Sequence, residues 1–174
     1  MLKAGLSCLL LSGLLSCNSQ NAELQSKLYD SLEQFESKNQ KADSFYKLNL
    51  DSLTDFDWER CYIFHADSYF DNETISKNTG IEFKGSSLDD GSRRLVFVKG
   101  DKIVSYVDIN LDDFNVYFAG GELQDNRHGN HQIQFYEASA TLIAFKKCNS
   151  DSWFFSPENE FDAFREMVEN NKCN

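Results

Sequence analysis

His128 and His131 lie three residues apart, and a His-x-x-His pair is one arrangement that holds zinc in proteins. A third ligand would have to come from elsewhere, and Glu122 or Asp125 carries a suitable carboxylate. The intervening Gly129-Asn130 is typical of a turn, so no helix is expected to hold both imidazoles on one side. The segment is a candidate metal site, although solvent-exposed loop histidines are the interpretation that we favour.

Other combinations of reactive residues are incomplete. The doublets Asp89-Asp90 and Asp112-Asp113 carry carboxylates of the kind found in hydrolases and calcium sites, but neither has EF-hand spacing and both suit turns. No Gly-x-Ser-x-Gly nucleophile elbow occurs. Cys61 and His65 share one side of a predicted strand, about 13 Å apart, which is too far for proton transfer. The sequence therefore indicates no catalytic residue and no cofactor.

An aromatic cluster among carboxylates is a candidate binding surface. Phe56, Trp58, Tyr69 and Phe70 lie among Asp55, Asp57, Asp67 and Asp71. Aromatic rings bordered by acidic groups suit a basic protein or a glycan chain. The alternative, which we favour, is that Trp58 and its neighbours belong to the hydrophobic core.

The first seventeen residues have the pattern of an export signal. One cation, Lys3, precedes an apolar run over residues 4–15. This run has about a dozen residues, whereas a helix that spans a bilayer needs roughly twenty. A retained transmembrane helix is therefore not expected.

The end of this run resembles the lipobox of bacterial lipoproteins. Leu14-Leu15-Ser16-Cys17 places a Leu three positions before a Cys and a small residue directly before it, although Leu15 is less usual at its position than Ala or Ser. The resemblance implies cleavage after Ser16, lipidation of Cys17 and a protein anchored to a membrane of the bacterial cell envelope. Because no Asp follows Cys17, it implies the outer membrane if the cell is Gram-negative. The alternative is an ordinary secretory signal with a chance Cys.

The chain that remains is acidic. Removing residues 1–16 from the 174 leaves 158, enough for one domain with a single core. Without Lys3, 16 Lys and Arg stand against 28 Asp and Glu, a net charge near −12. This charge disfavours nucleic acid and anionic lipid as direct partners. It suits a basic envelope protein, divalent cations or solubility alone, and solubility alone is the interpretation that we favour.

Three cysteines remain besides Cys17. An exported compartment permits one disulfide, and we expect Cys148 to pair with Cys173, because that bond would join the last strand to the last helix. Cys61 lies between large apolar residues and is expected to be a buried thiol.

Helical periodicity appears near both ends of the mature chain. Leu24, Leu28, Leu32 and Phe35 recur at helical spacing and predict a helix over residues 22–41. At the other end, Ser156 is the expected N-cap of a helix with Pro157 at its first position and Phe161, Phe164, Met167 and Val168 on its buried face. A short helix capped by Asp71 or Asn72 is expected to end near Gly80.

Strand patterns fill the rest of the chain. Residues 58–65 are apolar on both faces and predict a central strand. Residues 94–99 and 102–107 flank Gly100-Asp101 and predict a hairpin in which Phe97 faces Val104, Val98 faces Ile103 and Leu95 faces Tyr106. Further strands are expected over residues 45–50 and 114–118, and an edge strand over residues 153–155.

Two stretches are harder to interpret. Residues 122–131 are polar and predict a long loop. Residues 132–147 fit either a hairpin that turns near Ala138-Ser139 or one long bulged strand.

These patterns together define an α+β domain with a mostly antiparallel sheet, an N-terminal helix and a C-terminal helix. Its expected organisation is a signal peptide over residues 1–16, a lipidated Cys and tether over 17–23, and a single domain over 24–174. We expect a cell-envelope lipoprotein whose domain binds rather than catalyses. An immunity-type inhibitor of a secreted toxin and a metal-assisted envelope hydrolase are the alternatives.

Overall fold

The computed structural model of the chain describes residues 21–38, 45–65, 71–120, 122–125, 132–146 and 151–164. Its helices are α1 (Ala22–Lys38) and α2 (Asn72–Thr79), with short 3-10 helices η1 (Leu50–Leu53) and η2 (Glu158–Glu160). The strands are β1 (Tyr46–Asn49), β2 (Arg60–His65), β3 (Ser92–Lys99), β4 (Lys102–Asn110), β5 (Val116–Phe118), β6 (Glu122–Asp125), β7 (Gln132–Glu137), β8 (Thr141–Lys146) and β9 (Trp153–Pro157). None of the helices in these ranges is long and apolar enough to cross a bilayer.

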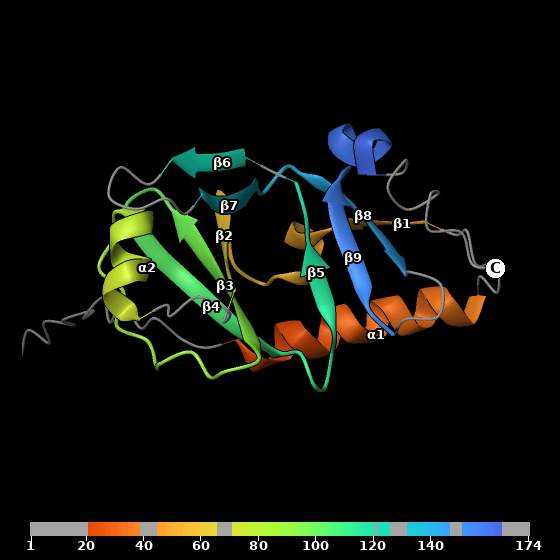
Figure 1. Cartoon of the computed structure of the whole chain (residues 1–174), viewed down its shortest axis with the longest axis horizontal. Helices are drawn as coiled ribbons and strands as arrows, with labels where there is room; N and C mark the ends of the chain where they lie inside the picture. The colour runs from red at the N-terminus through yellow and green to blue at the C-terminus, as the bar shows by residue number, and fades with distance from the viewer. Residues whose placement is uncertain are drawn as a thin grey trace, which may run out of the picture.

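The strands form two sheets rather than one (Figure 1). A five-stranded sheet has the order β4-β3-β2-β7-β6, and a four-stranded sheet has the order β1-β8-β9-β5. Every neighbouring pair is antiparallel except β5 and β9, which run parallel. The predicted α+β class with mostly antiparallel pairing is confirmed.

Helix α1 crosses both sheets. At its start, the Asn21 N–H donates to the Tyr106 carbonyl of β4, and near its end the Phe35 ring stacks on Tyr46 of β1 with centroids 4.9 Å apart. The predicted stripe of Leu24, Leu28 and Leu32 is buried, each residue being 1% exposed. These residues join Cys61, Phe97 and Leu142 in a core that draws side chains from both sheets.

A second apolar cluster covers the other face of the five-stranded sheet under α2. Tyr62, Phe64 and Val96 pack there against Ile75 of the helix. The predicted ends of α2 are confirmed: the Asp71 carboxylate accepts a hydrogen bond from the Thr74 N–H at 2.7 Å, and Gly80 ends the helix with a φ of +72°. As predicted, β2 is a central strand with both faces covered.

The predicted hairpin is present, but its register is only partly as expected. Val98 faces Ile103, whereas Phe97 faces Ser105 and Leu95 faces Val107. The register shifts between Phe97 and Val98, so Val104 is an extra residue on β4, as in a β-bulge. The predicted Phe97–Val104 and Leu95–Tyr106 pairs were wrong because the sequence carried no sign of this insertion.

Residues 132–146, the described part of the stretch, form neither of the two arrangements that the sequence left open. Strand β7 belongs to the five-stranded sheet and β8 to the four-stranded sheet, with a turn at Ala138-Ser139 between them. The chain therefore passes from one sheet to the other at this corner. Part of the predicted polar loop, Glu122–Asp125, forms strand β6 on the edge of the five-stranded sheet.

The last strand is longer and more central than expected. Strand β9 lies between β8 and β5 and is not an edge. It runs through Ser156, which is fully buried and pairs with Ile143, so Ser156 is not a helix N-cap. Pro157 precedes η2, and helical structure continues through residues 161–164. The rest of the predicted C-terminal helix lies outside the described residues.

Candidate functional site

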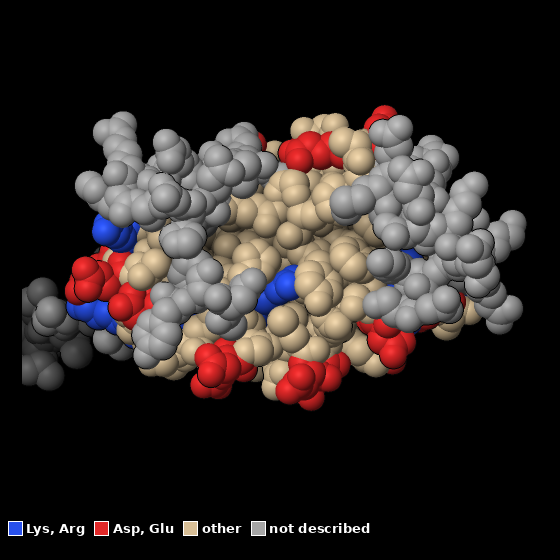
Figure 2. Space-filling model, viewed as in Figure 1, with Lys and Arg blue, Asp and Glu red and all other residues tan. Residues whose placement is uncertain are grey.

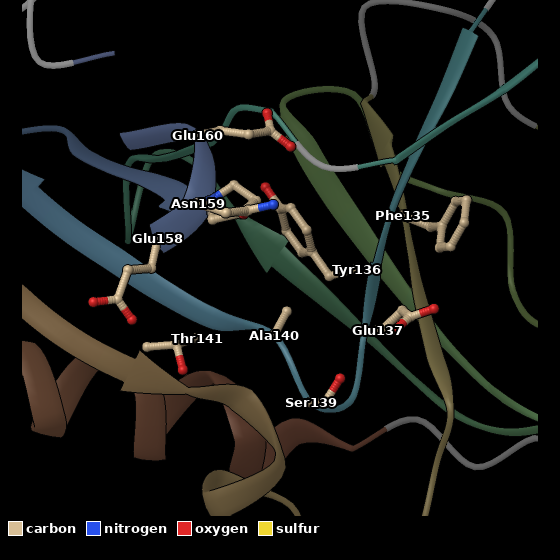
Figure 3. Close-up of a pocket in the computed structure, with 10 residues that line it drawn as sticks. Phe135, Tyr136, Glu137, Ser139, Ala140, Thr141, Glu158, Asn159 and Glu160 are labelled. Atoms are coloured by element: carbon tan, nitrogen blue, oxygen red, sulfur yellow. The ribbon is translucent and has the colours of Figure 1, made fainter. Parts of the chain in front are cut away.

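A cavity of about 430 Å³ opens where the corner between β7 and β8 meets η2. Tyr136 contributes to it from β7, Ser139 and Ala140 from the corner, and Asn159 and Glu160 from η2 (Figure 3). Small-molecule sites in proteins commonly have volumes of about 300–1,000 Å³. The junction cavity, as we call this site, is therefore large enough for a small ligand.

Strand alternation determines which side chains of β7 reach the cavity. Successive residues of a strand point to opposite faces. Figure 3 shows the Tyr136 ring projecting toward η2, while Phe135 and the Glu137 carboxylate point to the other side of the strand. Phe135 packs there against Tyr62, with ring centroids 5.4 Å apart. Glu137 therefore lines the cavity without directing its charge into it.

Tyr136 forms a fixed wall of the cavity. Its ring is 2% exposed, and its hydroxyl donates to the Ala119 carbonyl at 3.1 Å and accepts from the Gln134 side-chain amide at 2.9 Å. Burial, and to a smaller extent the nearby Cys61 and Glu160, raises the pKa of this hydroxyl well above its ordinary value. Tyr136 is therefore neutral at physiological pH, and its orientation is set by the protein before any ligand arrives.

The carboxylates on η2 already have neighbours within the protein. Glu158 forms an ion pair with Lys47 of β1. The Glu160 carboxylate lies against Gly120, so closely that a Cβ atom at this position would collide with it. Gly120 also has a φ of +68°, a conformation that favours glycine. Glycine at this position thus lets the chain after β5 pass beneath Glu160.

The described side chains that line the junction cavity are mostly hydrogen-bonding groups. Among the residues that the structure describes, they include hydroxyls, an amide and carboxylates, but no His, Cys, Lys or Arg. Ser139 and Thr141 thus have no basic partner among the lining residues that would activate a hydroxyl as a nucleophile. What the arrangement offers is a set of hydrogen-bonding groups beside a wall that is held in place at Tyr136.

The outer face of the four-stranded sheet is a second notable surface. Tyr117, Phe154 and Phe145 lie in a row across β5, β9 and β8, with adjacent ring centroids 5.1 and 5.5 Å apart and both ring pairs tilted by 15°. The Arg93 guanidinium lies over the outer face of Tyr117 at 4.2 Å. Figure 2 shows a mostly uncharged surface over β5 and β9. The rings cover one another's faces, and Phe145 is itself buried, whereas Tyr117 at the other end of the row is 39% exposed.

The aromatic residues that the sequence singled out occupy the core where they are described. Trp58 is 5% exposed, its indole N–H donates to the Thr54 hydroxyl at 3.1 Å, and its ring packs edge-on against Phe97 at 5.1 Å. Phe56 contacts the same Phe97 ring at 5.4 Å. These two rings thus stabilise the domain, in agreement with the favoured interpretation that Trp58 and its neighbours belong to the hydrophobic core. Tyr69, the third candidate, lies outside the described residues.

The other predicted sites fall largely outside the described ranges. These residues are Cys17, His128, His131, Cys148 and Cys173. Within the described ranges, no three His, Cys, Asp or Glu side chains converge as metal ligands would. Cys61 is a free and fully buried thiol, as predicted, and burial raises its pKa strongly.

The sequence did not predict the junction cavity, because the residues that line it are distant along the chain. The acidic Glu158 and Glu160 were assigned to the first turn of a long helix. Ala138-Ser139 was recognised only as a possible turn within one sheet. The Pro157-Glu158-Asn159-Glu160 run directly after an apolar strand is the one signal that indicates a polar turn beside the core.

Comparison of the chain with protein families, with curated proteins and with solved structures gives no match. The site is therefore interpreted from its own geometry.

Proposed function

We propose that this protein is a lipid-anchored lipoprotein of the bacterial cell envelope whose domain binds a ligand in the junction cavity without transforming it. The observation that carries the binding role is the cavity itself, which has the volume of a small-molecule site and a wall held in place by hydrogen bonds. A preformed site of this kind spends little free energy on ordering when a ligand binds.

The anchor rests on the resemblance of Leu14-Leu15-Ser16-Cys17 to a lipobox. Each buried CH₂ of an acyl chain contributes about 0.8 kcal/mol to membrane binding, so two or three chains hold a protein firmly. The binding domain would then be retained at the envelope surface. The outer membrane is the proposed location in a Gram-negative cell.

The two alternative functions gain no support from the described residues. The hydrolase requires His128 and His131, which lie outside those ranges, and the inhibitor rests on acidity and size. The described part of the cavity lining offers neither a cluster of metal ligands nor a basic catalytic group. Binding is therefore the function that the geometry supports best.

The binding role is tested by ligand-observed NMR with a fragment set containing neutral, cationic and anionic compounds. The full chain would be compared with Ser139→Trp, which places a large ring at the exposed mouth of the cavity. We expect a group of fragments that bind the wild-type protein and lose binding to Ser139→Trp, with unchanged circular dichroism. The binding proposal fails if no fragment shows this dependence.

The anchor is tested separately by feeding cells an alkyne-tagged fatty acid. We expect the label on the wild-type chain and its loss in Cys17→Ser. A wild-type chain without label would remove the anchor from the proposal and leave the binding role to its own test.

A further inference from the structure

We infer that the ligand of the junction cavity is a neutral, hydroxyl-rich molecule of the saccharide class. This inference rests on the proposed binding function and adds the chemistry of the ligand. It follows from three features of the cavity, which are its hydrogen-bonding groups, its charged side chains and its apolar side.

The lining offers donors and acceptors together. Asn159 carries an amide that both donates and accepts, Ser139 and Thr141 carry hydroxyls that do the same, and the adjacent Glu160 carboxylate only accepts. A sugar hydroxyl also donates and accepts at once, so each can donate to the carboxylate and accept from the amide. An ammonium ion has only donors and would leave the Asn159 N–H groups without a partner on the ligand.

The three carboxylates that line the cavity differ in what they offer a ligand. Lys47 pairs with Glu158, the Glu137 carboxylate points away from the cavity, and Glu160 packs against Gly120. A cationic ligand would compete with Lys47 for Glu158, at a small cost because solvent screens this exposed pair. An anionic ligand would be opposed by Glu160, whose field already reaches the Tyr136 hydroxyl. A neutral ligand meets neither cost.

The cavity also has an apolar side, of which only a small part is open to a ligand, because Tyr136 and Pro157 are buried and Ala140 is half-buried. Tyr136, Ala140 and Pro157 line it together. By contrast, the ring faces in the aromatic row of Tyr117, Phe154 and Phe145 are stacked on one another, and Phe145 is buried. The junction cavity is therefore the better saccharide site of the two, although its aromatic surface is smaller.

The test uses the full chain in a detergent without a sugar headgroup. The probes are neutral hexoses, N-acetylhexosamines and their disaccharides, with hexosamines as cationic and hexuronates as anionic counterparts. Binding is measured by saturation-transfer NMR, and affinities of the hits by isothermal titration. We expect neutral saccharides to bind, and Ser139→Trp to abolish this binding.

One substitution at the cavity and one control away from it sharpen the test. Asn159 is exposed, so Asn159→Asp keeps the shape and the fold, removes both amide donors and adds a charge. We expect it to weaken saccharide binding by about ten-fold, as expected for a lost hydrogen bond to the ligand. The matched control is Asn21→Asp at the N-cap of α1, where Asp caps as well as Asn, and it should leave the affinity unchanged.

The possible outcomes separate this inference from the proposed function. If charged fragments bind in a manner that Ser139→Trp abolishes while no neutral saccharide does, the binding role stands and the saccharide inference is wrong. If neutral saccharides bind equally to wild type and Ser139→Trp, they bind elsewhere and the inference is also wrong. If nothing binds in the cavity, both proposals fail.

Discussion

The guanidinium of Arg94 is fully buried, which is costly unless its charge and donors are satisfied. Asp108 accepts two hydrogen bonds from it, at 2.6 Å from Nε and 2.7 Å from Nη2, and the Ser86 carbonyl accepts a third at 2.8 Å from Nη1. The Tyr106 and Phe83 rings enclose the cation at 4.8 and 5.2 Å. Arg94 thus fastens the loop after α2 to the five-stranded sheet.

Removing Asp108 alone should lower the stability of the protein more than removing Arg94 and Asp108 together. We expect Asp108→Ala to lower the free energy of unfolding by about 3 kcal/mol, because it leaves a buried guanidinium without its counterion. The double variant Arg94→Met/Asp108→Ala should lose less than the single variant. Urea unfolding followed by circular dichroism measures both values.

The control for this prediction is the exposed pair formed by Lys99 and Asp57 at 2.8 Å. Asp57→Ala should change stability little, because solvent screens such a pair. An Asp108→Ala protein as stable as the wild type would show that Arg94 finds an equivalent partner, and would contradict the assigned role.

At the scale of elements, α1 shows how far the sequence predicts packing. The stripe of Leu24, Leu28 and Leu32 indicated a helix with one buried face, and the structure buries all three. The sequence could not show that this face meets both sheets, because helical spacing identifies a face and not its partner. The contacts at Tyr106 and Tyr46 supply that information.

The contribution of this packing can be measured at Leu28, which is 1% exposed in the core that both sheets share. Leu28→Ala should lower the free energy of unfolding by about 3 kcal/mol, through lost burial and the cavity that it leaves. Asp30→Ala on the exposed face of α1 is the matched control and should have little effect. Chemical denaturation monitored by circular dichroism gives both changes, and equal losses in the two variants would mean that α1 does not depend on its apolar face.

The strands show a different limit of sequence prediction. Gly100-Asp101 identified the β3–β4 turn, yet the extra residue Val104 left no trace, because a bulge requires no particular residue type. Likewise, β7 and β8 alternate as two hairpin strands would, although they belong to different sheets. Alternation reports which side chains share a face, and it does not identify the neighbouring strand.

The junction cavity depends on that unpredicted change of sheet. Tyr136 lies before the corner, Ala140 lies within it, and Glu160 arrives from η2 after β9. The identities of these residues are visible in the sequence, but their proximity follows from the topology alone. Predicting the fold class therefore did not predict the site.

At the scale of the whole molecule, the two sheets share one core. Residues of the five-stranded sheet such as Phe97 and Cys61 belong to the same apolar cluster as Leu142 and Phe155 of the four-stranded sheet. Leu28 of α1 lies in this cluster as well. Since neither sheet can lose its partner without exposing this core, we expect them to unfold together.

The chain provides a reporter for each sheet. Trp58 packs against Phe97 of the five-stranded sheet, and Trp153 lies on β9 of the four-stranded sheet with the Lys146 ammonium 5.9 Å from its ring centroid. Trp58→Phe and Trp153→Phe therefore give two proteins, each with fluorescence from one sheet. Within each variant, we expect the urea midpoint from tryptophan fluorescence to equal the midpoint from far-ultraviolet circular dichroism.

The comparison is made within each variant because either substitution can change stability itself. Coincident midpoints in both variants mean that the two sheets and α1 form one cooperative unit, as expected for a single domain. A fluorescence midpoint that precedes the circular dichroism midpoint in one variant would show that its sheet unfolds first. The corner at Ala138-Ser139 would then join two separately stable parts, and the junction cavity between them would open before the rest of the protein unfolds.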